Sequence, residues 1–191
     1  LISRTAFFAG LYPLNRFTRF ELGAEFRNLD RANMFISRFV DYNRGLAGGL
    51  FVDSIPGGGS LNYAAPFAAF VQDNTLFGGT GPIYGHRYRA EVSPNIGKSD
   101  SFVNYLLDFR RYDAVIFSLL TLATRAYGNL SVGPGDAIFP KYLGQPSYIR
   151  GYDRENYVSA SCGLTSANSA GCSANQLLGS RVALVNAELR F

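Results

Sequence analysis

Arg150 is the residue of this sequence whose chemistry most restricts where it can lie. It occurs in the run Tyr148-Ile149-Arg150-Gly151-Tyr152. A guanidinium group has five donors in a rigid plane and keeps its charge, so away from bulk water it must meet carboxylate or carbonyl oxygens. Gly151 allows the backbone to turn where a Cβ would clash. Two interpretations follow: a segment folded inward as a plug and anchored by Arg150, or a solvated loop in which this run occurs by chance.

Residues for covalent chemistry are scarce. The only histidine is His86, so a Ser/His/Asp triad and a histidine-based metal site both lack their parts. Asp153 and Glu155 could act as an acid/base pair. Arg154 lies between them and Arg150 lies nearby, so salt bridges within the loop are the better explanation of these two carboxylates. The sequence contains no P-loop and no dinucleotide-binding motif. We therefore expect no enzyme activity, no cofactor and no metal.

Two cysteines, Cys162 and Cys172, lie in a segment rich in Ser, Ala, Asn and Gly, with no histidine or further cysteine nearby. A zinc site would need about four ligands. A disulfide that closes one loop in an oxidising compartment is the favoured interpretation, and two free thiols are the alternative.

The elements that position these residues are predicted from an alternation of apolar and polar side chains with period two, the pattern of a strand with two different faces. In 17–28, for example, Phe20 and Leu22 fall on one face while Glu21 and Arg27 fall on the other. Residues 34–43 either continue that strand or form a short one. We expect seven antiparallel strands, over 1–11, 17–28, 61–72, 84–93, 101–111, 115–127 and 181–191.

The connections between these runs differ in length. Residues 12–16 and 111–114 form short turns, whereas 44–60 and 128–180 are long. This pattern is typical of strands that cross a layer, with tight turns on one side and large loops on the other.

The balance of charge favours a sheet with an apolar outer face. Charged residues make up 17% of the chain, against about 25% in soluble domains. Runs of this length suit the ~9–11 residues of a tilted transmembrane strand. Opposite charges at spacing two suit a water-filled lumen. The alternative is a soluble β-sandwich, whose strands alternate in the same way.

Two other classes are disfavoured. The apolar, charge-free run 114–124 is too short for a spanning helix. The net charge of +4 comes from arginines that alternate with apolar residues, whereas nucleic-acid binders cluster their basic residues on one face. Because the chain starts at Leu1 and stops in a strand-like run, we expect it to be a piece of a longer protein.

Three motifs, in this order, resemble the bacterial surface antigen superfamily of outer-membrane barrels, the BamA, TamA and FhaC type. The turn at 73–77 (DNTLF), followed by Gly81 or Gly85, resembles its D-N-P-L turn. Residues Ile149, Arg150, Gly151 and Tyr152 resemble its V/I-R-G-F/Y motif, and 183–191 resembles the strand after it.

The resemblance implies an all-β fold, an antiparallel transmembrane β-barrel of which residues 1–191 form a part, about strands six to twelve of roughly sixteen. It implies that 128–180 is an outer loop folded into the lumen as a plug, with Glu188 as the partner of Arg150. The implied function is insertion or transport of proteins at the bacterial outer membrane. The implied partners are membrane lipid, client proteins, and periplasmic domains or partner subunits. An anchoring barrel without transport and a soluble β-sandwich binding module are the alternatives.

Overall fold

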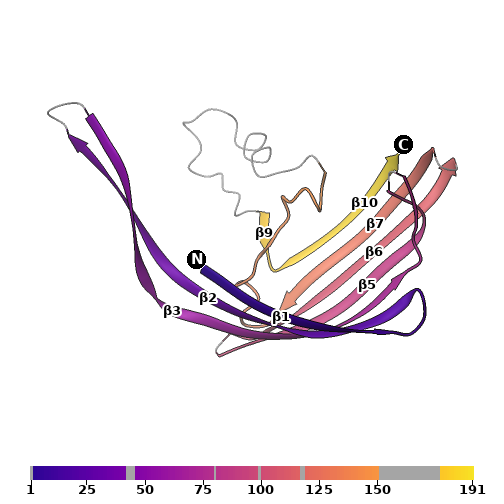
Figure 1. Ribbon diagram of the computed structural model, residues 1–191, viewed down its shortest axis with the longest axis horizontal. Helices are drawn as coiled ribbons and strands as arrows, with labels where there is room; N and C mark the ends of the chain where they lie inside the picture. Colours follow the sequence, from indigo (N-terminus) through magenta and orange to yellow (C-terminus); the bar gives the residue numbers. More distant parts are fainter. Residues whose placement is uncertain (1, 42–45, 80, 99, 117–118, 151–176) are drawn as a thin grey trace.

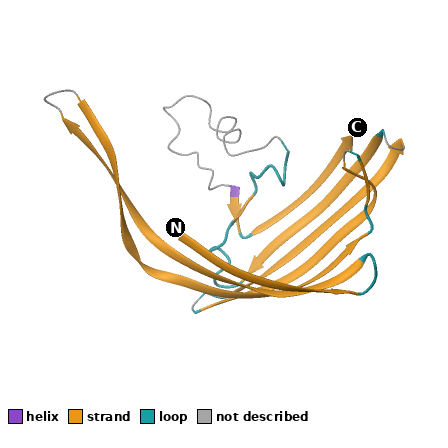
Figure 2. Ribbon diagram, in the orientation of Figure 1, coloured by secondary structure: helices purple, strands orange, loops and turns teal. Residues whose placement is uncertain are grey.

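The computed structural model describes residues 2–41, 46–79, 81–98, 100–116, 119–150 and 177–191, and within these it describes 31–59 by the backbone alone. The protein is built almost wholly of strands, as Figure 2 shows. Its described residues contain no helix that is long and apolar enough to cross a membrane. Seven long strands are present: β1 (Ile2–Pro13), β2 (Thr18–Asp41), β3 (Leu46–Asp73), β5 (Gly81–Gly97), β6 (Phe102–Ile116), β7 (Leu120–Val132) and β10 (Arg181–Arg190).

These seven strands form one antiparallel sheet in the order β1-β2-β3-β5-β6-β7-β10. The short β4 (Leu76–Gly78) pairs with β5, and β8 (Lys141–Tyr142) pairs with β9 (Leu178–Gly179) in a small second sheet. Each of the seven predicted strands is therefore present. The short turn predicted at 111–114 was wrong, because β6 continues through these residues to Ile116 and pairs there with β7. Among the described residues the sheet is open, with β1 and β10 as its edges.

The prediction of a long loop over 44–60 was wrong. The chain of β2 continues to Asp41 and pairs with β3 from Leu46 onward, so 34–43 continues the second strand. The ladder shifts between the pairs Asp30–Ser60 and Ala32–Pro56, so that 57–59 form a bulge on β3. Three consecutive glycines suggest a loop, but glycine also accommodates the irregular backbone of a bulge. The resulting ribbon extends beyond the other strands (Figure 1).

The sheet is strongly curved, and the segment 133–150 lies on its concave side (Figure 1). Contacts made by this one segment confirm the curvature. Phe139 reaches Tyr63 on β3, whereas Arg150 reaches Glu188 on β10, four strands further along the sheet. The sheet thus wraps around the segment that follows β7.

The convex face is apolar and exposed. In β10 the exposed and half-buried positions alternate strictly. From Val185 to Arg190 the exposed residues are the apolar Val185, Ala187 and Leu189, and the half-buried ones are Asn186, Glu188 and Arg190. Val185 is 85% exposed and Leu189 60%, while Leu107 on β6 is 62% exposed. The concave face carries most of the charged residues, although Arg111 and Asp113 lie in phase with Leu107 on the convex side of β6. The alternation predicted from the sequence is thus realised with the apolar side outward.

Two prolines meet inside the sheet. The ladder between β3 and β5 breaks after Ala64–Ile96 and resumes at Ala68–Val92, a register that sets Pro66 opposite Pro94. Proline has no N–H to donate, so neither residue can close the ladder here. The other edges of both prolines remain paired, Pro66 with Ala24 on β2 and Pro94 with Val103 on β6.

Aromatic rings on β3 cover glycines on both neighbouring strands. Phe67 pairs with Gly23 on β2, and Tyr63 pairs with Gly97 on β5. A Cβ at Gly23 would lie 2.7 Å from Cε1 of Phe67, and one at Gly97 would lie 2.6 Å from Cε1 of Tyr63. An aromatic ring over a strand glycine shields the backbone that the missing side chain exposes.

We predict that Gly23→Ala destabilises the protein by about 1–3 kcal/mol, because the new methyl group overlaps the Phe67 ring and the Phe8 carbonyl oxygen. The unfolding midpoint in detergent measures this. Gly10→Ala is the matched control on the adjacent strand, where the nearest atom to a new Cβ is at 3.8 Å. Equal effects of the two substitutions would show that the ring does not lie over Gly23.

Candidate functional site: the concave face and the segment on it

Ion pairs cross the β2–β3–β5 half of the concave face. Glu21 on β2 accepts from Arg19 at 2.7 Å and from Arg89 on β5 at 2.5 Å, and Arg89 also donates to Glu91 at 2.6 Å. On the strand between them, β3, the residue that pairs with both Glu21 and Glu91 is Ala69, which is 2% exposed. The ion pairs therefore bury an alanine on the polar face, and the long arginine spans from one strand to the next but one.

A second set of ion pairs lies on β6, β7 and β10. Asp108 accepts from Arg110 at 2.7 Å and from both Nε and Nη2 of Arg125 at 3.0 Å each. Glu188 accepts from Arg190 at 2.7 Å and from Arg150 at 2.6 Å. In this half each carboxylate is shared between two arginines.

The segment 133–150 begins with a turn at Gly133, whose φ is +144°. A Cβ there would lie 2.7 Å from the Cα of Phe102, so the turn packs closely on β6. The segment then places Phe139 against Tyr63 and Phe102, with ring centroids 5.3 and 5.7 Å away. The guanidinium of Arg27 lies 5.2 Å from the same ring. This aromatic contact fixes the start of the segment on the concave face.

Lys141 makes the next contact. Its Nζ donates to Oγ of Ser131 at 2.5 Å, and that hydroxyl donates to Oδ1 of Asn104 at 3.1 Å. Ser131 is fully buried. Burial lowers the pKa of Lys141, while the charge of Asp136 acts in the opposite direction. A short polar chain thus ties the segment to β7 and β6.

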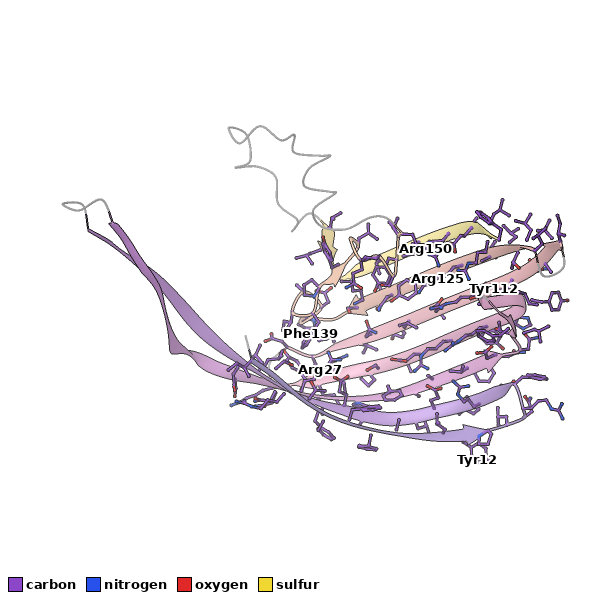
Figure 3. The ribbon with its side chains drawn as sticks, turned by 45° about the horizontal axis from the view of Figure 1, so that its top comes forward. Tyr12, Arg27, Tyr112, Arg125, Phe139 and Arg150 are labelled. Atoms are coloured by element: carbon purple, nitrogen blue, oxygen red, sulfur yellow. The ribbon has the colours of Figure 1, made fainter. Side chains whose placement is uncertain are left out.

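The residues before Arg150 are held by backbone contacts. Arg125 donates to the carbonyl oxygen of Ser147 at 2.8 Å, and Asn186 donates to that of Tyr148 at 2.7 Å. The hydroxyl groups of Tyr127 and Tyr148 lie 3.2 Å apart, with ring centroids at 5.1 Å. These contacts come from β7 and β10 together, and Figure 3 shows Arg125 and Arg150 close to each other over these strands.

Tyr148 keeps its proton over the whole physiological range. Burial first, and the hydrogen bond with Tyr127 second, raise the pKa of Tyr148 to about 12. A protonated hydroxyl can both donate and accept, which the pairing of two tyrosine hydroxyls requires.

The structure brings together Arg150 and Glu188, the pair implied by the resemblance, with Nη1 2.6 Å from Oε1. Ile149 lies next to them and is exposed. The side chain of Arg150 is 74% exposed. Its ion pair with Glu188 is therefore the most solvent-exposed of the contacts that hold the segment. Gly151 and Tyr152, and the predicted disulfide between Cys162 and Cys172, lie outside the described residues.

Several residues that hold the segment were not singled out from the sequence. Arg125 and Tyr127 fall on one face of β7 at spacing two, a signal available in the sequence. Phe139 and Lys141 lie in a stretch without periodicity, so no local pattern marks them. The strand β7 also extends to Val132, and the connection therefore begins five residues later than Gly128.

We predict that Asn186→Ala loosens 133–150 more than Arg150→Ala does. The first substitution removes a hydrogen bond to the half-buried Tyr148, which contributes about 0.5–1.5 kcal/mol, whereas an exposed ion pair contributes about 0.2–1 kcal/mol. Hydrogen exchange of residues 133–150, read by mass spectrometry, measures both effects. Val185→Ala, on the opposite face of β10, should leave the exchange unchanged, and faster exchange in that control would contradict the assignment.

The described residues contain no group of three or more His, Cys, Asp or Glu side chains that could hold a metal ion. The concave face provides charged groups, hydrogen-bond donors and a segment fixed by side chains from several strands.

Searches of family models, curated proteins and solved structures found no match to the chain.

Proposed function

We propose that the chain forms part of a transmembrane β-barrel of the bacterial outer membrane, with its convex face toward lipid and its concave face toward water. The observation that carries this proposal is the division of one long sheet into an exposed apolar face and an ion-paired polar face. Monomeric soluble proteins rarely expose apolar patches of more than a few hundred Å². The convex face spans several strands, and Phe26, Leu107 and Val185 on it are all more than half exposed.

The polar face supports the same proposal. In lipid, each backbone N–H and C=O group must be satisfied within the protein, which strand pairing achieves along the sheet. Charged side chains must then face water or each other. Those of the concave face do so through pairs within and between strands, such as Glu21 with Arg89.

We assign the barrel to protein assembly or translocation in the surface antigen superfamily, on the resemblance of its three motifs. The contact between Arg150 and Glu188 supports this assignment. Such a barrel would act on client proteins by strand pairing and local distortion of the bilayer, without covalent chemistry. The segment 133–150 would narrow the lumen, and the protein would work with periplasmic domains or partner subunits.

The soluble β-sandwich is the weaker alternative. A sandwich covers the apolar face of each sheet with a second sheet. In the part of the chain that the structure describes, the small β8–β9 sheet includes Lys141–Tyr142 of the segment, on the polar side, and the large apolar side chains of the convex face stay exposed.

Single tryptophans test the orientation cleanly because the chain has no Trp of its own. Leu107→Trp and Leu106→Trp place the probe at successive positions of β6, hence on opposite faces. In liposomes, lipids with brominated acyl chains should quench the fluorescence of the Leu107→Trp protein strongly and that of the Leu106→Trp protein weakly, while aqueous iodide should do the reverse. Equal quenching of the two proteins, or a protein that stays in solution without detergent, would contradict the membrane proposal.

Activity is tested separately from orientation. Proteoliposomes that hold the complete protein should insert an unfolded outer-membrane client faster than empty liposomes do. Asn186→Ala, which releases the segment from β10, should change that rate. A protein that is correctly oriented but gives no acceleration would be an anchor, which would overturn assembly or translocation and leave the barrel intact.

A further inference from the structure

The two halves of the concave face differ in charge. On β2, β3 and β5 the paired groups balance, since four arginines meet four carboxylates in the described structure: Arg19, Arg27, Arg87 and Arg89 against Glu21, Glu25, Asp73 and Glu91. On the concave face of β6, β7 and β10, together with the end of the segment, four arginines share only two carboxylates in ion pairs. These are Arg110, Arg125, Arg150 and Arg190 against Asp108 and Glu188. Four positive charges against two leave an excess of two.

This excess surrounds one cavity. A space of about 670 Å³ lies between the concave face and residues 146–150, and all four of these arginines line it. Glu188 is the one carboxylate among the described lining residues, whereas Asp108, which binds Arg110 and Arg125, does not line the cavity. Figure 3 shows Arg125 and Arg150 at this place, with Tyr112 further along the sheet.

The arginines keep donors that their carboxylates do not use. Arg190 binds Glu188 through Nε and Nη2, and Arg110 binds Asp108 through the same two atoms. Each guanidinium has five N–H donors, so the Nη1 groups are not used by those carboxylates. Arg110 and Arg190 are only about a third exposed, at 38% and 34%. Like charges gathered in such a half-buried space call for a counter-anion.

We propose that this cavity binds a phosphate group. Arginine forks suit tetrahedral oxyanions, which can accept several charge-assisted bonds from different directions. Here the forks come from β6, β10 and the segment. The volume exceeds that of a bare phosphate ion, so the group can belong to a lipid headgroup or to a soluble phosphate ester. The phosphate site does not depend on the membrane proposal, because the cavity lies on the polar face and its lining is the same whether or not the convex face contacts lipid.

Titration of the complete protein with inorganic phosphate, by calorimetry in detergent, tests the site. We expect saturable binding that weakens with added salt and falls about tenfold or more in Arg190→Gln and in Arg110→Gln. Arg19→Gln is the matched control, because Arg19 and Arg190 both bind a carboxylate two residues away, and it should bind phosphate as the unchanged protein does.

Competition then identifies the source of the phosphate. For a lipid headgroup, phosphatidic acid in micelles displaces inorganic phosphate far more effectively than glycerol 3-phosphate does. For a soluble ester, the two displace it alike. No saturable phosphate binding at millimolar concentration, as would result if a carboxylate from elsewhere in the protein fills the cavity, would overturn the proposal. Equal weakening in Arg19→Gln would do the same.

Discussion

The structure depends on ion pairs that reach across strands on a single face of the sheet. A charged side chain on that face has neighbours two residues away along its own strand and directly across the ladder. Arg89 binds Glu91 along its own strand and reaches Glu21 on the next strand but one, while Ala69 on the intervening strand leaves room for the arginine. Because these charges satisfy each other, the opposite face is free to be largely apolar. One alternation thus determines the environments of both faces.

The segment after β7 uses the same face as its support. It is attached at three places of different chemistry: an aromatic contact at Phe139, a buried polar chain at Lys141, and carbonyl contacts from Arg125 and Asn186. The attachment is thereby spread from β2 to β10. A segment held at both ends of a curved sheet also limits how far the sheet can flatten. The ion pair of Arg150 adds to this attachment, although most of it comes from less exposed groups.

Period-two alternation was enough to predict the seven strands and the division of their faces. It also placed Asn186, Glu188 and Arg190 together on the polar side of β10. It failed where local composition conflicts with pairing: the glycines of 57–59 suggested a loop, yet they occupy a bulge in a ladder that β2 sustains. The contacts of Phe139 and Lys141 could not be predicted, because they join residues distant in sequence through a segment with no repeating pattern. The alternation could have placed Arg125 on the polar face of β7, but it could not have predicted that Arg125 binds the carbonyl oxygen of Ser147.

The facing prolines give the sheet a built-in crease. Between β3 and β5, residues 65–67 and 93–95 are not paired, and the side chain of Asn95 donates to the free carbonyl oxygen of Ser93 at 3.0 Å. At these three positions the sheet can bend without breaking a backbone bond between β3 and β5. Deformation between the two strands should therefore begin at this gap, while the pairs on either side of it, 63–64 with 96–97 and 68–73 with 87–92, hold the strands together.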